Sequence, residues 1–400
     1  MKKEGEVKMN VIDLFSGVGG FSTGFLKAGH DVILANEFDK SIAESYKKNH
    51  PNALMINEDI KDFSSNPYTY IEQNINEITN IKRQKEIKDK LNDVNVIIGG
   101  PPCQSFSMAG SRIRKKKDFI EDPRNNLFKY YYQLLKWFEP EYFVFENVEG
   151  LMTMNNGDLL AEIVEIFSDP NSFNFGGYNV DFCLVDFSRL GVPQKRKRLI
   201  IIGSKSKKVK LKKEIKDYIF QNNIKNNISI KDAISDLSYL NAGEGEQISQ
   251  YIYKPLTDYQ RARRKNLKQL YNHKAPNHSI KVLNRISELK QGQNFKNLKD
   301  SYSIKSIHSG SYGRLNWEEP AYTITTRFDT PSAGRVIHPE YNRALTPREA
   351  ARIQSFDDDF VFIGSKSSIG KQIGNAVPPI AAKIIADIIK KSNEEENIEH

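Results

Sequence analysis

The first half of the chain alternates short apolar runs with stretches whose apolar positions recur at helical spacing. Runs rich in β-branched and aromatic residues predict buried strands at residues 11–15, 31–36, 53–56, 94–98 and 142–145. Helical patterns follow at residues 21–28 and, as a Lys- and Glu-rich surface insertion, at residues 66–92. Apolar runs at residues 183–185 and 198–202 predict two more strands, which could pair as a hairpin. This alternation is typical of βαβ units and predicts an α/β fold with a mostly parallel sheet.

The pattern changes beyond residue 204, where the chain becomes rich in Lys, Asn and Ile and only weakly periodic. We predict a linker over residues 205–228 and a helix over residues 228–237. A later helix begins with Thr346 as N-cap, Pro347 at the first helical position and Glu349 completing a capping box. A last helix covers residues 378–391. We therefore predict one domain over residues 1–228, with residues 361–400 packing back onto it, and a smaller, irregular domain over residues 229–360.

Composition narrows the classes of protein that fit. Two cysteines among 400 residues give neither a disulfide framework nor a four-cysteine metal site. The seven histidines show no His-x-x-x-His pairing, so we expect no metal. The N-terminus carries no apolar signal segment, and no run of eighteen apolar residues occurs. We therefore expect a cytoplasmic protein with no membrane association.

Positive charge gathers in one part of the chain. The formal net charge is +9, and residues 241–320 hold 14 Lys and Arg against 7 Asp and Glu. Basic side chains alternate there with tyrosines, a pattern that favours a nucleic-acid surface over a solvated helix face. The basic residues are Arg261, Arg263, Arg264, Lys265 and Lys268, and the tyrosines are Tyr251, Tyr253, Tyr259 and Tyr271.

A cysteine at the end of the fourth predicted strand is the first candidate for chemistry. The sequence Gly-Gly-Pro-Pro-Cys-Gln-Ser-Phe-Ser over residues 99–107 places Cys103 on a loop stiffened by two prolines. Open α/β sheets bind ligands at the carboxyl ends of their strands. The position suits a fixed nucleophile, and a small buried thiol is the alternative.

The turn after the first strand predicts a cofactor site. Residues 13–20 read Asp-Leu-Phe-Ser-Gly-Val-Gly-Gly, so the glycines would let a ligand approach the backbone beside a helix N-terminus. Glu37, at the end of the second strand, could hold ribose hydroxyls. Asp59 could accept from an adenine amino group or serve as a helix N-cap. Ser22 stands where a dinucleotide motif needs its third glycine, which favours S-adenosylmethionine (SAM) over NAD. Phe15 would then give adenine an aromatic face or belong to the core.

Six segments, in order along the chain, together resemble the motifs of the cytosine-C5 DNA methyltransferases. The resemblance covers residues 11–203 and about 312–380, and the segment between has no motif of the family. The similar segments are the glycine turn at 13–21, the Cys103 loop at 99–107, Glu-Asn-Val at 146–148, Gln-x-Arg-x-Arg at 194–198, the late helix at 343–356 and Gln-Ile-Gly-Asn-Ala-Val-Pro-Pro at 372–379.

The resemblance implies a Rossmann-like SAM-dependent catalytic domain, a smaller target-recognition domain and methyl transfer to cytosine C5 in DNA. Cytosine C5 is a poor nucleophile until a thiolate adds to C6, and a cysteine thiolate is accessible near neutral pH. Cys103 would add to C6 while Glu146 meets N3 and Arg198 helps fix the base. Gln194 and Arg196 would support this catalytic site, and strand alternation would place Arg196 and Arg198 on one face.

The resemblance also implies the residues that bind cofactor and substrate. SAM, and its product S-adenosylhomocysteine, would be held by Phe15, Ser16, Gly17, Gly19, Gly20, Glu37, Phe38, Asp59, Ile60, Pro102, Asn375 and Ala376. The substrate would be held by Gln104, Ser105, Ser107, Arg112, Asn147, Thr325, Thr326 and Arg327.

The expected partner is double-stranded DNA. The target base lies inside the stacked duplex and must be flipped out. The basic stretch 107–118, with Gly110 as a hinge, would close over that base. We expect a monomer, associated with the bacterial nucleoid through DNA, and a restriction endonuclease that shares its site. The alternatives are the same chemistry on tRNA, a nicotinamide-dependent oxidoreductase and a DNA-binding relative without activity. Hydride transfer needs neither the Pro-Pro-Cys loop nor Glu-Asn-Val, and an intact Cys103 and Glu146 disfavour the inactive relative.

Overall fold

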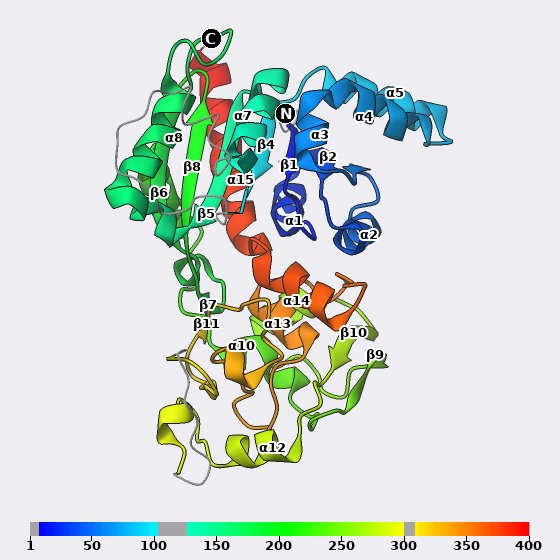
Figure 1. Cartoon of the computed structure of the whole chain (residues 1–400), viewed down its shortest axis with the longest axis vertical. Coiled ribbons are helices and arrows are strands. Elements are labelled where there is room, and N and C mark those ends of the chain that lie inside the picture. The colour runs from blue at the N-terminus through cyan, green and yellow to red at the C-terminus, as the bar shows by residue number, and fades with distance from the viewer. Residues whose placement is uncertain (1–7, 103–125, 300–308, 400) are drawn as a thin grey trace, which may run out of the picture. The chain divides into compact units, whose positions relative to one another are not determined.

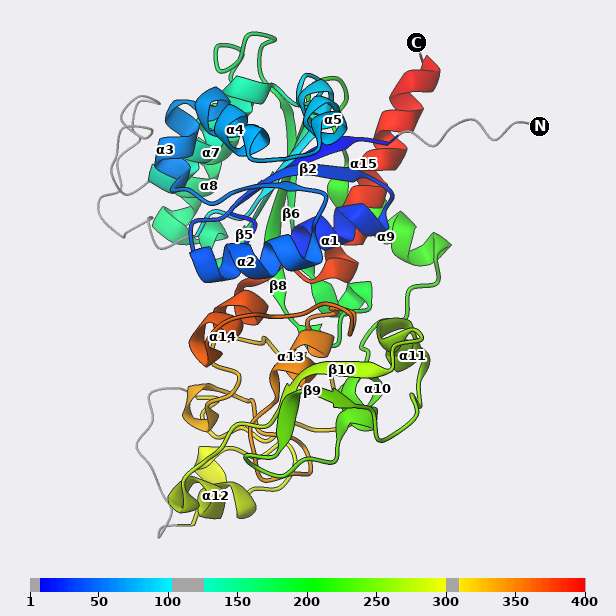
Figure 2. The same cartoon turned by 90° about the vertical axis from the view of Figure 1, so that its right-hand side faces the viewer.

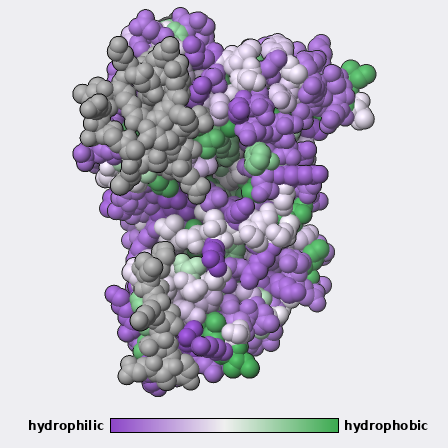
Figure 3. Space-filling view, viewed as in Figure 1, coloured by the Kyte–Doolittle hydropathy of each residue, from purple (hydrophilic) through white to green (hydrophobic). Residues whose placement is uncertain are grey.

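The computed structural model describes residues 8–102, 126–299 and 309–399, and the chain forms two compact units. Unit 1 comprises residues 1–186, 197–223 and 382–400, and unit 2 comprises residues 187–196 and 224–381. Figure 3 shows hydrophilic residues over most of the drawn face of each unit, with hydrophobic residues in small separate patches. Within the described ranges, no helix combines the length and the apolar composition that crossing a membrane requires.

Unit 1 is built on a mixed sheet of seven strands in the described part of the chain, in the order β3-β2-β1-β4-β5-β8-β6 (Figure 1). The first five are parallel, whereas β8 runs antiparallel to both β5 and β6. The sheet is therefore mostly parallel and α/β, as the sequence pattern predicts. The strands are β1 (Asn10–Leu14), β2 (Asp31–Asn36), β3 (Leu54–Ile56), β4 (Val96–Gly99), β5 (Tyr142–Val148), β6 (Asn179–Asp186) and β8 (Lys197–Ser204).

Helices cover both faces of this sheet (Figures 1 and 2). Helix α1 packs closely on α15, because Gly24 of α1 lies directly against Ala382 of α15. The opposite face is covered by α7 and α8, and α4 and α5 form the predicted insertion. The helices of unit 1 are α1 (Gly20–Lys27), α2 (Lys40–Asn49), α3 (Ile60–Ser65), α4 (Pro67–Asn76), α5 (Ile81–Leu91), α7 (Asn126–Phe138), α8 (Asp158–Ser168), α9 (Leu211–Gln221) and α15 (Pro379–Glu399).

An aromatic core holds α7 and α8 on the centre of the sheet. Phe143 of β5 contacts Phe167 of α8 with ring centroids 4.4 Å apart, and Tyr131 of α7 meets Phe145 edge to face at 5.4 Å. The buried Tyr131 hydroxyl donates to the Val144 carbonyl. Large buried rings whose polar atoms are hydrogen-bonded stabilise such a layer strongly. This core therefore fixes the end of β4 at Gly99 and the part of β5 around Phe145.

Unit 2 contains short elements and little regular sheet. Two small pairs, β9 with β10 (antiparallel) and β7 with β11 (parallel), accompany five helices in the described part of this unit. The strands are β7 (Gln194–Lys195), β9 (Gly245–Gln250), β10 (Gln269–Lys274) and β11 (Ala321–Tyr322). The helices are α10 (Ile230–Ile234), α11 (Asp258–Arg264), α12 (Ile280–Ser287), α13 (Pro347–Ile353) and α14 (Lys366–Asn375).

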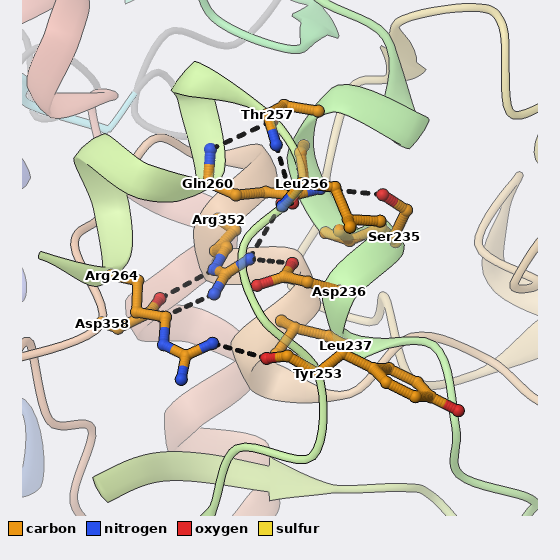
Figure 4. Close-up of polar contacts among 12 residues, drawn as sticks. Ser235, Asp236, Leu237, Tyr253, Leu256, Thr257, Gln260, Arg264, Arg352 and Asp358 are labelled. Carbon is orange, nitrogen blue, oxygen red and sulfur yellow. Dashed lines mark hydrogen bonds and ion pairs between the residues drawn. The ribbon is translucent and has the colours of Figure 1, made fainter. Parts of the chain in front are cut away.

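Buried ion pairs organise unit 2 around α13. Arg352 donates to Asp236 and to both carboxylate oxygens of Asp358 (Figure 4). Arg343 makes two bonds of 2.7 Å to Glu349, which also accepts from the Thr346 amide. The predicted capping box of Thr346 and Glu349 is present. Bidentate arginine–carboxylate pairs fix geometry as well as charge, so α13 is held from several directions.

The linker predicted over residues 205–228 is wrong. Residues 211–221 form α9, whose Leu211 and Ile215 are buried in unit 1. The amide of Leu211 donates to Asp181 of β6, and Lys391 of α15 pairs with Glu214. The helical pattern was not recognised in this Lys-rich segment, because the apolar face of α9 is narrow.

The compact units also differ in their bounds from the domains proposed from the sequence. Residues 187–196 and 361–381 belong to unit 2, and the last segment of unit 1 begins only at Ala382. The reason is local packing, since Gly370 and Gly374 of α14 lie directly against the backbone of Thr325 and Thr326. Because a side chain at either glycine would collide with backbone, α14 is bound to the β11 segment of unit 2.

Candidate active site

The glycine turn after β1 has an unusual backbone. Phe15, Gly17 and Gly19 all have positive φ, at 56°, 54° and 91°. A Cβ at Gly19 would lie 2.5 Å from the His50 ring, so glycine is needed there both for conformation and for space. Glu37, just past β2, accepts the Gly17 amide at 3.0 Å and the Asp39 amide at 2.7 Å. These bonds fix the turn to the end of β2.

The side chains at this turn fit a nucleoside-like cofactor. The Ser16 hydroxyl is buried and has no hydrogen-bond partner among the described residues, as expected for a group that faces a ligand. The Phe38 ring is 72% exposed beside Glu37, where it can stack on a purine. Burial raises the pKa of the Glu37 carboxyl. The side chain of Phe15 packs partly on the hydrophobic core, and Ile60 is buried.

Asp59 has a structural role in the fold. Its Oδ1 accepts the Lys61 amide at 2.8 Å, and the residue is the N-cap of α3. The N-cap alternative is thus present in the structure, and one carboxylate oxygen remains for another donor. Gly20, at the start of α1, is buried, and Pro102, just past β4, is exposed.

A buried polar chain lies beneath the glycine turn. Asp13 Oδ2 accepts from both the amide and the hydroxyl of Ser22, at 3.2 and 2.5 Å. The Ser22 hydroxyl also lies 2.8 Å from the Tyr46 hydroxyl. Burial raises the pKa of Asp13 to about 7, against the hydrogen bonds from Ser22, which lower it. Sequence reasoning treated Asp13 only as part of the turn motif, although a carboxylate at the buried end of a strand was the available signal.

The pairing of β5 with β8 brings Glu146 to Arg198. In the antiparallel pair of β5 and β8, Glu146 is opposite Ile200, so Arg198 is its diagonal neighbour on the same face. The Arg198 Nε lies 2.9 Å from Glu146 Oε1, and the two side chains are only 15% and 12% exposed. A partly buried, charge-assisted pair of this kind fixes the carboxylate in one orientation.

Asn147 joins the two strand ends. Its side-chain amide donates to the Pro101 carbonyl at 3.0 Å, and its oxygen accepts the Val148 amide. The side chain is buried, so Asn147 holds the backbone that leads into the Cys103 loop. Cys103, Gln104, Ser105, Ser107 and Arg112, together with the basic stretch 107–118, lie outside the described residues.

Gln194 and Arg196 both form hydrogen bonds with backbone groups of unit 2. Arg196 lies between the separate strands β7 and β8, and its guanidinium donates to the carbonyls of Ile324 and Ala376. Gln194 accepts the Ile324 amide. The prediction that Arg196 shares a strand face with Arg198 is wrong, because β8 begins at Lys197 and strand alternation therefore does not include Arg196.

The remaining predicted residues all lie in unit 2. Thr325 and Arg327 are exposed and Thr326 is partly buried, on the segment that Gln194 and Arg196 hold. Asn375, the last residue of α14, is exposed, and the Ala376 carbonyl accepts from Arg196.

Much of the basic run in α11 is paired within the chain. Arg263 meets Asp357 at 3.2 Å, and Lys265 meets Asp357 and Asp359 at 3.0 and 2.7 Å. Arg264 stacks on Tyr251, 3.5 Å from the ring centroid, and donates to the Tyr253 carbonyl, a bond drawn in Figure 4. The sequence pattern suggested a nucleic-acid surface, whereas the structure gives these cations internal carboxylate and aromatic partners.

Comparison with known proteins gives one consistent family. The model of the family "C-5 cytosine-specific DNA methylase" matches residues 9–391. The type II methyltransferase M.DdeI of Desulfomicrobium norvegicum is 35% identical over 95% of this chain and 88% of its own length. The type II methyltransferase M1.HphI of Haemophilus parahaemolyticus is 34% identical over 98% of this chain and 89% of its own length.

Solved structures agree in fold. A chain described as a DNA modification methyltransferase encoded within an Escherichia coli prophage has a TM-score of 0.68, at 27% identity, covering 96% of this chain and 99% of its own. The Dnmt2 methyltransferase of Schizosaccharomyces pombe has a TM-score of 0.58 at 14% identity, covering 98% of this chain and all of its own, a likeness of fold alone.

Proposed function

The chain belongs to the C-5 cytosine-specific DNA methylases, and on that premise we propose that it methylates C5 of a flipped-out cytosine in a specific duplex DNA sequence, with SAM as methyl donor. It is an enzyme, a DNA methyltransferase of the type II restriction–modification kind. The observation that supports the chemistry best is the Glu146–Arg198 pair beside the strand end that leads to Cys103.

The proposed reaction begins with a covalent bond from the protein to the base. The thiolate of Cys103 adds to C6 of cytosine, which moves electron density to C5 and N3. A proton held between Glu146 and N3 would neutralise the negative charge that the addition moves onto N3. Arg198 occupies Oε1 of Glu146, which leaves Oε2 for the base. Once C5 carries the methyl group, its proton would pass to water and the Cys103 thiolate would depart, which leaves 5-methylcytosine and the free enzyme.

SAM, when bound, supplies the electrophilic methyl group and leaves as S-adenosylhomocysteine. We propose that Ser16, Gly17, Gly19 and Gly20 of the glycine turn lie against it. Glu37 would accept from the ribose hydroxyls, since a carboxylate offers about four lone-pair sites and two carry backbone amides here. Phe15 and Phe38 would pack on the adenine, and Asp59, Ile60, Pro102, Asn375 and Ala376 stay in the proposed set by family resemblance.

DNA would be held through residues of both units. Gln104, Ser105, Ser107, Arg112 and Asn147 would contact the extruded nucleotide and its backbone, and Thr325, Thr326 and Arg327 would support binding by unit 2. The structure favours a positioning role for Asn147, through Pro101, and for Gln194 and Arg196, through Ile324. We further propose a monomer that acts at the nucleoid and protects sites cut by a cognate endonuclease.

Trapping on a modified substrate tests this function. Duplex DNA with 5-fluorocytosine at the target cannot lose a C5 proton, so the wild-type enzyme with SAM should form a denaturant-stable adduct. The Cys103→Ala variant should form none while it still binds SAM. An adduct that persists in Cys103→Ala, or that forms on tRNA and not on DNA, would contradict the proposal.

A further inference from the structure

The strand end after β4 contains two consecutive glycines that meet different neighbours. A Cβ at Gly99 would lie 2.8 Å from the Tyr131 ring and 2.9 Å from the Leu14 carbonyl oxygen. A Cβ at Gly100 would lie 2.9 Å from Oε2 of Glu146. Neither glycine has the positive φ that side chains avoid, so what limits both positions is space.

The atoms in the way differ in how easily they can move. Tyr131 is fully buried in the aromatic core, and the Leu14 carbonyl belongs to the backbone of β1. Close-packed cores resist such movement, so a methyl group at Gly99 is opposed by the core. Glu146 Oε2 is the far end of a flexible side chain, so a methyl group at Gly100 can be accepted by moving the carboxylate. Stability depends on Gly99, whereas the direction of the Glu146 carboxylate depends on Gly100.

We infer that Gly100 is a positioning residue for the Glu146 carboxylate. Two contacts then define its orientation: Arg198 Nε holds Oε1 at 2.9 Å, and the bare Cα of Gly100 leaves room for Oε2. The register of β4 and β5 brings these groups together, because Gly99 pairs with Phe145, the residue before Glu146. Displacement of reacting groups by about 1 Å can lower a rate about 100-fold. The inference rests on the proposed role of Glu146 at N3 of cytosine.

The test compares three glycine variants of the full-length enzyme. Gly100→Ala should bind SAM and DNA with wild-type affinity and should unfold at a similar temperature. Its single-turnover rate of methyl transfer, at saturating SAM and DNA, should fall at least about tenfold. Gly150→Ala is the matched control, because its Cβ would have only Val148, at 4.0 Å, as a neighbour, and it should keep the wild-type rate. Gly99→Ala should lower the unfolding temperature instead.

Two further measurements separate this inference from the proposed function. If Gly100→Ala lowers the unfolding temperature at all, the loss should vanish in a Glu146→Ala background, where the opposing side chain is absent. An unchanged loss in that background, or a folded Gly100→Ala with a rate within twofold of wild type, would overturn the inference. The single variant Glu146→Ala tests the proposed function separately, since full activity in that variant would remove the role of Glu146 at the base.

Discussion

At the scale of single residues, the pair of Glu146 and Arg198 determines how the site can work. The guanidinium is less than one-fifth exposed and touches one carboxylate oxygen. Arg198→Ala should reduce methyl transfer about 100-fold, because the carboxylate would lose the contact that orients it. A radiolabelled methyl-transfer assay under saturating substrate measures the change.

The neighbouring lysine provides the control for that substitution. Lys197 is about half exposed, and its ion pair with Glu149 is 3.7 Å long. Lys197 pairs with Glu149 and not with Glu146. Exposed pairs contribute little, so Lys197→Ala should leave the turnover rate within about twofold of wild type. Equal losses in both variants would show that the site needs positive charge in general and not the Arg198 contact.

The raised pKa of Asp13 predicts that this residue stabilises the folded protein less as the pH rises. Its pKa is raised to about 7 in the folded protein, against about 4 in an unfolded chain. The folded state therefore favours the protonated acid, and the stabilisation from this group is complete below pH 4 and is lost as the pH rises through 7. The full difference corresponds to about 4 kcal/mol.

Asp13→Asn mimics the neutral acid and removes this titration. Relative to wild type, the variant should become progressively more stable as the pH rises from about 4 to about 7, and the difference should level off above pH 7, measured by urea unfolding at each pH. The difference between the two proteins is the informative quantity, because every other titrating group is common to both. A difference that stays constant with pH would contradict the buried, protonated state of Asp13.

At the scale of helices and strands, the hydrophobic pattern and the turn residues were sufficient to predict most strands of unit 1. The runs at residues 31–36 and 142–145 are β2 and the first part of β5, and the hairpin expected at residues 183–202 is the antiparallel pair β6 and β8. The capping box at Thr346 also proved correct. Helix α9 was missed because only Leu211 and Ile215 of its eleven residues are buried.

The stability of unit 2 depends on a buried arginine of helix α13. Arg352 is fully buried between Asp236 and Asp358, so Arg352→Ala would leave Asp236 without its ion-pair partner and Asp358 with only the longer pair to Arg348, at 3.9 Å. Such a loss costs about 3–5 kcal/mol in unfolding free energy. Urea unfolding measures it, followed by the fluorescence of Trp317 of unit 2 in a Trp137→Phe background, which removes the other tryptophan. Lys231→Ala, which removes an exposed pair with Glu318, is the control and should cost at most about 1 kcal/mol. Similar losses in the two variants would contradict the structural role of this buried network.

At the scale of the whole molecule, sequence patterns revealed the family and the α/β fold but not the partners of individual charged side chains. Six motifs sufficed for the family because all of them, in the family's order, are very unlikely to occur together by chance. The pairing of Lys265 with Asp357 and Asp359 joins residues far apart in the chain and has no local signal. The same holds for Arg196, whose acceptors Ile324 and Ala376 lie well over a hundred residues away.

The net charge of +9 still predicts how DNA binding responds to salt. Affinity for duplex DNA should fall linearly on a log–log plot as salt rises, because cations that contact phosphates release counterions. Lys265→Ala should leave the slope unchanged, since Lys265 is already paired with two carboxylates. Fluorescence anisotropy with labelled DNA gives both slopes. A flat response of the wild-type protein, or a slope that falls by about one in the variant, would contradict this distribution of charge.

Bisulfite sequencing of DNA from a host that expresses the protein tests the central claim most directly. A C5 methyl group protects cytosine from conversion, so the wild-type protein should leave protected cytosines in one short sequence context. A host that expresses Cys103→Ala should show conversion at the same positions. Absence of any protected context with the wild-type protein, or the same protection with Cys103→Ala, would contradict a cytosine-C5 DNA methyltransferase that acts through Cys103.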